Sequence, residues 1–535
     1  MSTRVRLGER GAAIAPELFG HFLERASWGE SGPERAWQAA APHLRPDCLQ
    51  ALRELSPALV RFPGGSDVDY TDWRDLISGA PGRADPARPL TRGHTGQTVA
   101  NRFGLHEFCA LRDALGFEVL WCVKVLTAFL EREPLGAVAH QAAALVAYLN
   151  APLDADLPAE LAVYPRLRAA NGHEAPFGVR RFQLGNETWF QLEGSGKAGT
   201  LPQAYPDAAA AAFCTCLRTI GEAMLAVDPT IGLIVDAPPR RAAPASCQVM
   251  ADPWVREHVS LLACHAYAPG PLEPPTHRDQ SERAVTAEEL WYAWVAQPGG
   301  FDASGQAQAD GERYRWLAEA GWDLAVTEWN WNGFPAAQGA TTCGLAKDVA
   351  AMLGATGFLH GMLRHADVLR LATQSMLLGH SWDLALIHYD FAAAQEAAHY
   401  AAHGAAAKLY RHHHGERLVA TTVDGPCYEQ PWATQWAPAQ PTVAYLDVVA
   451  TADAQLLYLH VINRDHAREQ ALSLDPGAWR LSGAGRWWSL GGAWRAADAQ
   501  SDHHIDLRPL ASGSLERLMI PPRSVNVIAI PVTGG

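Results

Sequence analysis

The sequence lacks several features that would each assign it to a particular class of protein. It has no uninterrupted apolar stretch of about 20 residues, the length that a membrane-spanning helix requires. The first ten residues include charged side chains with no apolar core behind them, so we expect no secretory signal. The nine cysteines are scattered and form no C-x-x-C pair. These absences predict a cytoplasmic protein without disulfides, a cysteine-bound zinc ion or a membrane partner.

Positive charge is also scarce. Lysine and arginine number 43 against 57 aspartates and glutamates, which gives a net charge of −14. A nucleic-acid-binding protein needs a basic face, so this balance argues against a nucleic-acid partner. The negative net charge fits a protein that acts on a neutral small molecule. The length of 535 residues is enough for two or three domains with a large core.

Short apolar runs, each a predicted strand, alternate with helical stretches over most of the chain. The eight runs cover residues 17–24, 58–65, 117–125, 182–184, 231–235, 259–263, 324–327 and 366–372. Helical spacing is found at residues 46–55, 101–115, 137–150, 208–227, 313–320 and 345–362. This alternation predicts an α/β fold, a (β/α)8 TIM barrel over residues 17–395.

The pattern changes after about residue 395. Runs with a period of two cover residues 446–450, 455–463, 486–490 and 524–531. They predict an antiparallel, jelly-roll-like β-sandwich over residues 396–535. Residues 3–15 are predicted to form an isolated strand, and we expect residues 1–16 to pack with the C-terminal sandwich.

Polar side chains follow several of the predicted barrel strands, where a barrel carries its active site. Glu187 follows the strand at residues 182–184 through Gly-Asn, and Glu328 directly follows the strand at residues 324–327. Glycoside hydrolysis needs two such carboxylates, one to protonate the leaving oxygen and one to attack the anomeric carbon or activate water. Further polar groups at strand ends are Glu24, Arg61, Asn186, His265 and Tyr267.

Each of these residues also has an ordinary structural explanation. Gly-Asn-Glu is often only a turn, and a single strand-end glutamate is often a surface ion-pair partner. Their joint placement favours a barrel enzyme with two carboxylates. Trp189, Trp329 and Trp331 flank the glutamates, where aromatic rings often stack on sugars. The tract Arg411–His414 is predicted to be a solvated helix end or loop rather than a metal site, because adjacent imidazoles point in different directions and can hardly share one metal ion.

These motifs resemble glycoside hydrolase family 51, the α-L-arabinofuranosidases, in clan A of the retaining (β/α)8 enzymes. Residues 17–24 (ELFGHFLE) and 60–65 (VRFPGG) are similar to the family's first two strands. Residues 184–187 (LGNE) match its acid/base motif and residues 327–330 (TEWN) its nucleophile motif. Residues 459–464 and 521–525 in the predicted sandwich are also similar to the family.

The resemblance implies roles for individual residues. Glu187 would be the general acid/base and Glu328 the nucleophile of a double displacement, with their carboxyl groups about 5–5.5 Å apart. Arg61 and Tyr267 would keep Glu328 ionised and oriented. The implied substrate-binding residues are Glu24, Arg61, Asn186, His265, Tyr267, Trp189 and Gln374.

The predicted activity is the release of terminal α-L-arabinofuranose from oligosaccharides, with no metal or organic cofactor. The resemblance further implies a homo-oligomer, often a hexamer. Ser66 and Lys124 depart from the family pattern, so the accepted sugar stays open: a β-xylosidase, another furanosidase or an endo-glucanase would use the same residues. A non-catalytic carbohydrate-binding barrel is the third interpretation.

Overall fold

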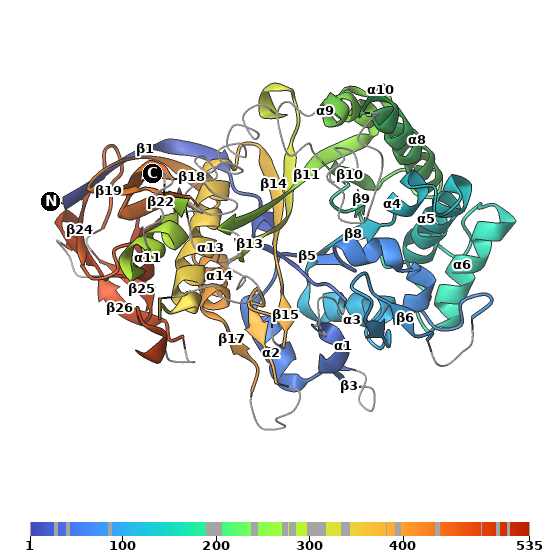
Figure 1. The fold of residues 1–535 in the computed structure, drawn as a ribbon, viewed down its shortest axis with the longest axis horizontal. Coiled ribbons are helices and arrows are strands. Elements are labelled where there is room, and N and C mark those ends of the chain that lie inside the picture. Colours follow the sequence, from blue (N-terminus) through green and yellow to red (C-terminus); the bar gives the residue numbers. More distant parts are fainter. Residues whose placement is uncertain are drawn as a thin grey trace.

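The fold combines a barrel with a β-rich region formed by both ends of the chain (Figure 1). The computed structural model describes residues 2–25, 30, 32–38, 43–83, 88–188, 206–236, 244–269, 276–277, 285–296, 317–332, 343–380, 382–390, 397–433, 439–482, 484–498, 503–510 and 514–533.

Eight parallel strands close into the predicted barrel. In order around the barrel they are β2 (Gly20–Phe22), β5 (Leu59–Phe62), β8 (Glu118–Val123), β9 (Arg181–Leu184), β10 (Gly232–Asp236), β11 (Val259–Pro269), β13 (Leu324–Asn332) and β14 (Leu369–Gln374). Strand β14 pairs with β2 and closes the ring. The first strand is shorter than predicted, because Pro16–Phe19 forms a 3-10 helix, η1. Proline has the backbone angle of a first helical turn and begins η1 for that reason.

The predicted crossover helices are present at α2 (Pro46–Leu55), α3 (Leu105–Leu115), α5 (Leu135–Asn150), α8 (Pro206–Leu225) and α13 (Lys347–Arg364). The predicted helix at residues 313–320 lies partly outside the described residues. Helices that the sequence analysis missed are α6 (Ala159–Ala170), α9 (Pro244–Ala251), α10 (Pro253–His258) and α11 (Ala287–Ala296). Proline inside α6 and at the start of α9 and α10 breaks the periodic signal, and α11 is apolar on most faces. None of the described helices is long and apolar enough to cross a bilayer.

Shorter elements lie in the connecting loops. They are α1 (Pro33–Ala36), α4 (Leu126–Phe129), β3 (Trp37–Gln38), β4 (His43–Leu44), β6 (Thr91–Arg92), β7 (Thr98–Val99), β12 (Thr276–His277), β15 (Leu378–Gly379), β16 (Ile387–His388), β17 (His399–Tyr400), β19 (Cys427–Gln430), β20 (Trp432–Ala433), β21 (Gln440–Ala444) and the 3-10 helices η2 (Ser66–Tyr70), η3 (Trp73–Leu76), η5 (Ala496–Asp498) and η6 (Ser514–Glu516).

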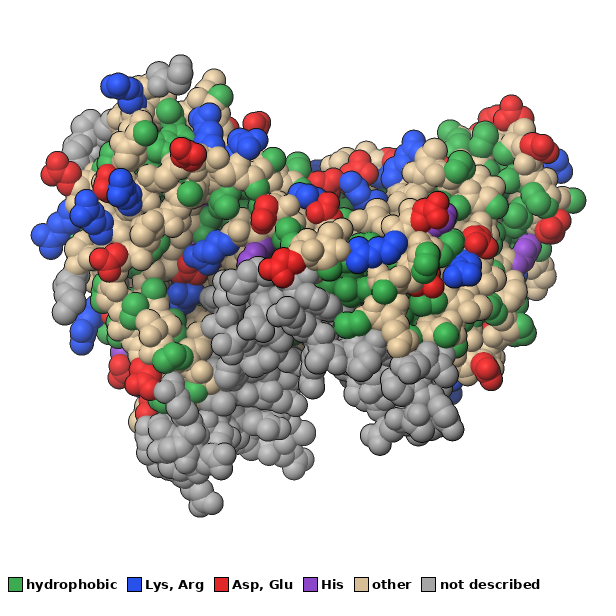
Figure 2. Space-filling view, turned by 90° about the horizontal axis from the view of Figure 1, so that it is seen from above, with side chains coloured by type: hydrophobic (Ala, Val, Ile, Leu, Met, Phe, Trp, Pro, Cys, Tyr) green, Lys and Arg blue, Asp and Glu red, His purple; other side chains and the backbone are tan. Residues whose placement is uncertain are grey.

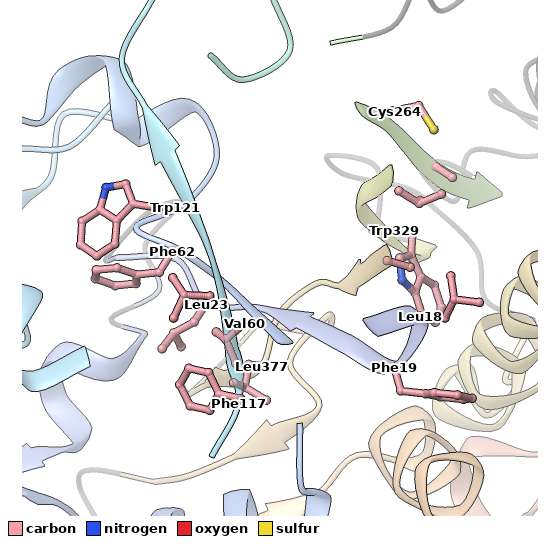
Figure 3. Close-up of a cluster of buried hydrophobic side chains, with 14 of the residues drawn as sticks. Leu18, Phe19, Leu23, Val60, Phe62, Phe117, Trp121, Cys264, Trp329 and Leu377 are labelled. Atoms are coloured by element: carbon pink, nitrogen blue, oxygen red, sulfur yellow. The ribbon is translucent and has the colours of Figure 1, made fainter. Parts of the chain in front are cut away.

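The barrel strands bury side chains on both faces. A layer of apolar side chains fills the interior at one level: Leu59, Leu120, Ile234, Leu261, Ala263, Ala325 and Leu371. On the outer face, Phe62 stacks on Phe108 of α3 with ring centroids 4.3 Å apart, and Trp121 packs edge-on against Phe62. Figure 3 shows Val60, Phe62 and Trp121 within this outer cluster. Because strand residues alternate between faces, the residues two positions beyond the interior layer point inward as well.

The β-rich region is one hydrogen-bonded sheet of nine strands. Their order is β26 (Asp506–Leu510), β25 (Gly485–Gly491), β28 (Ser524–Pro531), β23 (Leu456–Asn463), β22 (Leu446–Ala452), β18 (Arg417–Asp424), β1 (Ser2–Ala13), β24 (Gln470–Asp475) and β27 (Leu518–Ile520). Buried side chains from both ends of this order share one cluster, so the sheet curves over its own core. The predicted fold class is confirmed, and the exact domain boundaries stay a prediction. Residues 402–412 form a helix, α14, that packs on α13 and α2.

Charged side chains of both signs are interspersed on the face that Figure 2 presents. A buried charge cluster lies where helix α13 meets the sheet. The Asp447 carboxylate of β22 accepts hydrogen bonds from Arg364 of α13 and from Arg464, the latter at 2.8 Å, and His360 of α13 lies 3.3 Å away. Arg464 also donates to the Val295 carbonyl of α11 at 3.1 Å. This cluster therefore ties two barrel helices to the β-rich region.

We predict that Asp447→Asn destabilises the protein by about 3–5 kcal/mol at neutral pH, because the buried Arg464 loses its carboxylate. Burial raises the pKa of Asp447, but Arg364, His360 and Arg464 outweigh it and hold the pKa well below its ordinary value. The stabilisation is therefore complete above the unfolded pKa of about 3.9 and is lost as the pH falls through the folded pKa. The gap between the melting temperatures of wild type and variant should be wide at pH 7, begin to shrink below about pH 4 and close as the pH falls through the folded pKa.

Calorimetric melting at pH 7 and below about pH 4 measures this difference in melting temperature. Asp475→Asn is the matched control, because Asp475, at the end of β24 in the same sheet, pairs with an exposed arginine, Arg4. Equal melting temperatures for Asp447→Asn and wild type at pH 7 would contradict the prediction.

Candidate active site

The ends of strands β9, β11 and β13 bring the two predicted glutamates together. Glu328 lies on β13 opposite His265 of β11, and Glu187 follows β9. Nδ1 of His265 is 3.2 Å from Oε1 of Glu187 and 3.5 Å from Oε2 of Glu328. One oxygen of each carboxylate and one nitrogen of the imidazole lie within 4.8 Å of one another. The two carboxylates therefore approach each other closely, with one imidazole in contact with both.

A break in strand register directs Glu328 inward. Ala325 pairs with Ala263 and Val326 with Cys264, but His265 pairs with Glu328, so β13 has one residue more than β11 at this point. Such a bulge reverses which residues of a strand face inward. Ala325 belongs to the interior layer, and with the extra residue Glu328 also faces the barrel axis.

Arg61 occupies the centre of the site, fully buried. Its guanidinium donates to Oε1 of Glu328 at 2.7 Å, to Oδ1 of Asn186 at 2.6 Å and to Oε1 of Gln183 at 3.0 Å. Burial would lower the pKa of Arg61, but neighbouring acidic groups, Glu328 among them, raise the pKa above its ordinary value. A permanent positive charge thus lies against one of the two carboxylates.

Tyr267 contacts the other oxygen of the same carboxylate. Its hydroxyl donates to Oε2 of Glu328 at 2.9 Å and lies 2.7 Å from Oγ of Ser375. Burial, and then the charge of Glu328, raise the pKa of Tyr267 well above its ordinary value, so the hydroxyl keeps its proton. Both oxygens of Glu328 are therefore held by donors, which fixes the orientation of the carboxylate.

Glycines allow Glu24 to approach the same carboxylate. A Cβ atom on Gly65 would lie 3.0 Å from Oε1 of Glu328 and 3.3 Å from Oε1 of Glu24. A Cβ atom on Gly64, whose φ is +129°, would lie 2.6 Å from Cγ of Glu24. The Pro-Gly-Gly sequence is thus needed for space as well as for the turn.

The other predicted residues differ in how directly they reach the site. Asn186 contacts Arg61, and its amide nitrogen lies 3.5 Å from Oγ of Ser66. Gln374 is buried and donates at 3.3 Å to Asn330, the register partner of Tyr267. Trp189 lies outside the described residues.

Two further positions turn away from the site. Trp329 and Trp331 are buried on the outer face of β13, where Trp331 donates to the Trp294 carbonyl at 3.1 Å. The interpretation of these two rings as sugar platforms is therefore wrong, because the alternation of β13 directs them to the helices. Lys124 forms an ion pair with Glu133 at 2.8 Å.

Several residues of the site were missed from the sequence. Gln183 is a polar residue at an inward position of β9. Asp236 is the last residue of β10 and directly follows the predicted strand at residues 231–235, as Glu328 follows its own predicted strand. Asp236 accepts hydrogen bonds from Thr188 at 2.7 Å. The strand-end criterion that selected the glutamates would have found Asp236 as well, had it been applied to every predicted strand.

Glu187, His265 and Glu328 are also spaced so that they could hold a metal ion. The buried Arg61 already neutralises Glu328 and would repel a cation placed beside it, which disfavours this arrangement. The histidines of the tract at residues 411–414 contact different neighbours. Nε2 of His412 lies 2.7 Å from the Glu54 carbonyl oxygen, the ring of His413 stacks on Trp488, and the ring of His414 packs against Phe19 at a tilt of 37°. The last two are half-buried rather than solvated, because the helix end packs against neighbouring rings.

Comparison with known proteins extends these observations. Residues 51–271 match the family model described as the α-L-arabinofuranosidase 1 domain. The chain is 26% identical over 334 residues to an exo-α-(1→6)-L-arabinofuranosidase of Bifidobacterium longum, covering 60% of this chain and 55% of that protein. It is 34% identical over 209 residues to the probable α-L-arabinofuranosidase C of Aspergillus niger, covering 38% and 37%. The chain thus spans about half, or less, of the length of these relatives.

The fold comparison covers the whole chain. The solved structure of a family 51 α-L-arabinofuranosidase from Bifidobacterium longum superposes with a TM-score of 0.71 at 18% identity, over 99% of both chains. At this identity the likeness shows the fold. Together with the family-model match over residues 51–271, it confirms the resemblance of this chain to the α-L-arabinofuranosidases of glycoside hydrolase family 51.

Proposed function

We propose that the protein is a retaining glycoside hydrolase that releases terminal α-L-arabinofuranose from short oligosaccharides. One observation carries the proposal: the carboxylates of Glu187 and Glu328 lie close together, and the guanidinium of Arg61 donates a hydrogen bond to Glu328. Retaining enzymes need this short separation, whereas inverting enzymes hold their carboxyl groups about 6.5–9.5 Å apart. The similarity to arabinofuranosidases supports the choice of sugar.

The two glutamates have different roles in the proposed reaction. Glu328, which accepts hydrogen bonds from Arg61 and Tyr267, attacks the anomeric carbon and forms a covalent glycosyl-enzyme. Glu187 gives its proton to the leaving oxygen in that step. It then takes a proton from the water that releases the sugar. Glu24, Asn186 and His265 surround the carboxylates and are the groups that we expect to bind sugar hydroxyls, and no metal ion or organic cofactor takes part.

The proposal extends to the location and the oligomeric state of the enzyme, as expected from the sequence. A cytoplasmic enzyme would meet imported oligosaccharide fragments rather than intact polymer. We expect a homo-oligomer, with a hexamer as the form that the resemblance implies, and light scattering on purified protein measures its mass.

We predict that the protein hydrolyses nitrophenyl α-L-arabinofuranoside faster than the corresponding β-D-xyloside, β-D-galactofuranoside or β-D-glucoside. Glu328→Gln should lower turnover by at least about 10³-fold, because an amide cannot form the covalent intermediate. Glu118→Gln is the matched control, since Glu118 begins strand β8 at the opposite end of the barrel, and it should keep full activity. Nitrophenol release gives the rates, and dialysis against a chelator should leave them unchanged.

Each other result of this panel has a definite meaning. Faster cleavage of another glycoside would keep the mechanism and change the sugar. Binding of arabinose-containing oligosaccharides without cleavage of any glycoside would favour the carbohydrate-binding interpretation. Loss of activity on chelation would favour a metal ion at the glutamates.

The stereochemical course tests the double displacement separately. We predict that the first sugar released has the anomeric configuration of the substrate, because each of two displacements inverts it. Proton nuclear magnetic resonance spectra taken early in the hydrolysis, before mutarotation, identify the first anomer. An inverted product would rule out Glu328 as a nucleophile.

The hydrogen bond from Tyr267 to Glu328 gives a further prediction. Tyr267→Phe should lower kcat/KM by about 10- to 100-fold, because a hydrogen bond to a charged group contributes about 1.5–3 kcal/mol. Tyr400→Phe removes a hydroxyl bonded to a backbone carbonyl away from the site, and it should leave kcat/KM unchanged. A Tyr267→Phe variant as active as Tyr400→Phe would show that this hydrogen bond does not orient the nucleophile.

A further inference from the structure

The backbone that carries Glu187 has an unusual conformation. Glu187 has a φ of +51°, in the left-handed region that residues with a side chain seldom adopt, and Gly185 has a φ of +82°. A non-glycine residue stays in this region only when its surroundings hold it there. The carboxylate of Glu187 points toward His265 because of this turn, so whatever stabilises the turn also sets the direction of the carboxylate.

The residue after Glu187 is bound to a buried aspartate. Oδ2 of Asp236, at the end of β10, accepts hydrogen bonds from the backbone N–H and from the hydroxyl of Thr188, both at 2.7 Å. Thr188 is fully buried, and Asp236 is 5% exposed. The methyl group of Thr188 packs closely on Gly185: a Cβ atom at Gly185 would lie 2.6 Å from that methyl group. The two sides of the Glu187 turn are thus packed together and attached to β10.

The same aspartate connects to the partner of the nucleophile. Oδ1 of Asp236 lies 3.4 Å from Nε2 of Gln183, whose Oε1 accepts a hydrogen bond from Nε of Arg61. Arg61 in turn binds Glu328. The chain of contacts from Thr188 to Glu328 therefore fixes the acid/base turn relative to the nucleophile, although neither Asp236 nor Thr188 shows a hydrogen bond to either glutamate.

We propose that Asp236 and Thr188 are positioning residues that hold Glu187 in its left-handed turn and so direct its carboxyl group at the glycosidic oxygen. This inference rests on the proposed acid/base role of Glu187. Loss of either contact should let the turn relax and weaken proton transfer to the leaving group, while attack by Glu328 is left intact.

Substrates with different leaving groups separate this role from a general structural one. Dinitrophenolate departs without protonation, whereas an alkyl-substituted phenol needs a proton from the enzyme. A misdirected Glu187 therefore slows glycosylation with the phenol and leaves the dinitrophenyl substrate little affected. A variant that only lowers the amount of folded enzyme slows both substrates equally, so the ratio of the two rates reports position alone.

Thr188→Val keeps the packing and removes the hydroxyl. We expect it to reduce the ratio of the rate with the poor leaving group to the rate with the good leaving group by about 10-fold. Thr188→Ser restores the hydroxyl and should restore the wild-type ratio. Asp236→Asn should reduce the ratio by about 100-fold, because one amide cannot accept from both Thr188 and Gln183. Thr215→Val, on the exposed face of α8, is the matched control for removal of a threonine hydroxyl.

The experiment measures kcat/KM for a series of aryl α-L-arabinofuranosides with wild type, these variants and Glu187→Gln. The proposal is supported if kcat/KM falls more for poorer leaving groups, here called a graded loss, in Glu187→Gln, Thr188→Val and Asp236→Asn. Thr188→Ser should show no such graded loss. A graded loss with Glu187→Gln alone overturns the positioning role and keeps the proposed function. Equal losses across the series for Glu187→Gln itself would overturn the acid/base assignment and this inference with it.

Discussion

The ion pair between Arg61 and Glu328 is the interaction on which the site depends. A buried guanidinium is costly unless acceptors surround it, and here a carboxylate and two side-chain amides supply them. Those acceptors come from strand β13, strand β9 and the turn after β9, so one cation fixes several barrel strands around a common point. The apolar layer formed by residues such as Leu59 and Ala325 lies directly beneath, and it keeps water from reaching the ion pair from that side.

The same ion pair makes the two glutamates different. Glu328 is held by donors on both oxygens, one of them the Arg61 guanidinium, while Glu187 lies against the imidazole of His265. A fixed cation stabilises the negative charge of a carboxylate that it contacts. In the proposed mechanism, two chemically identical side chains serve as nucleophile and as acid because different groups contact them.

Much of this arrangement could be predicted from residue patterns, and the parts that could not have physical reasons. The eight apolar runs predicted the barrel, since parallel strands buried on both faces are continuous in hydrophobicity. Strand ends then predicted Glu187, Glu328 and Arg61 as neighbours. The bulge that turns Glu328 inward is a difference in register between two strands, which no single segment of sequence contains. Trp329 and Trp331 were assigned to the wrong face for a different reason: alternation along one strand points them away from the side that carries Glu328, and the sequence analysis did not apply it.

Both proposed catalytic glutamates occupy irregular backbone, one at a bulge and the other in a left-handed turn. Regular strands would place inward side chains two residues apart along fixed lines, which gives little control over where two carboxylates meet. An irregularity in each strand end shifts its carboxylate independently, and the surrounding hydrogen bonds then have to hold each irregularity in place. Gln183 and Asp236 are examples of such supporting side chains. Both are buried and hydrogen-bonded to each other behind the glutamates. The precision of the proposed site thus comes from the network behind the glutamates as much as from the glutamates themselves.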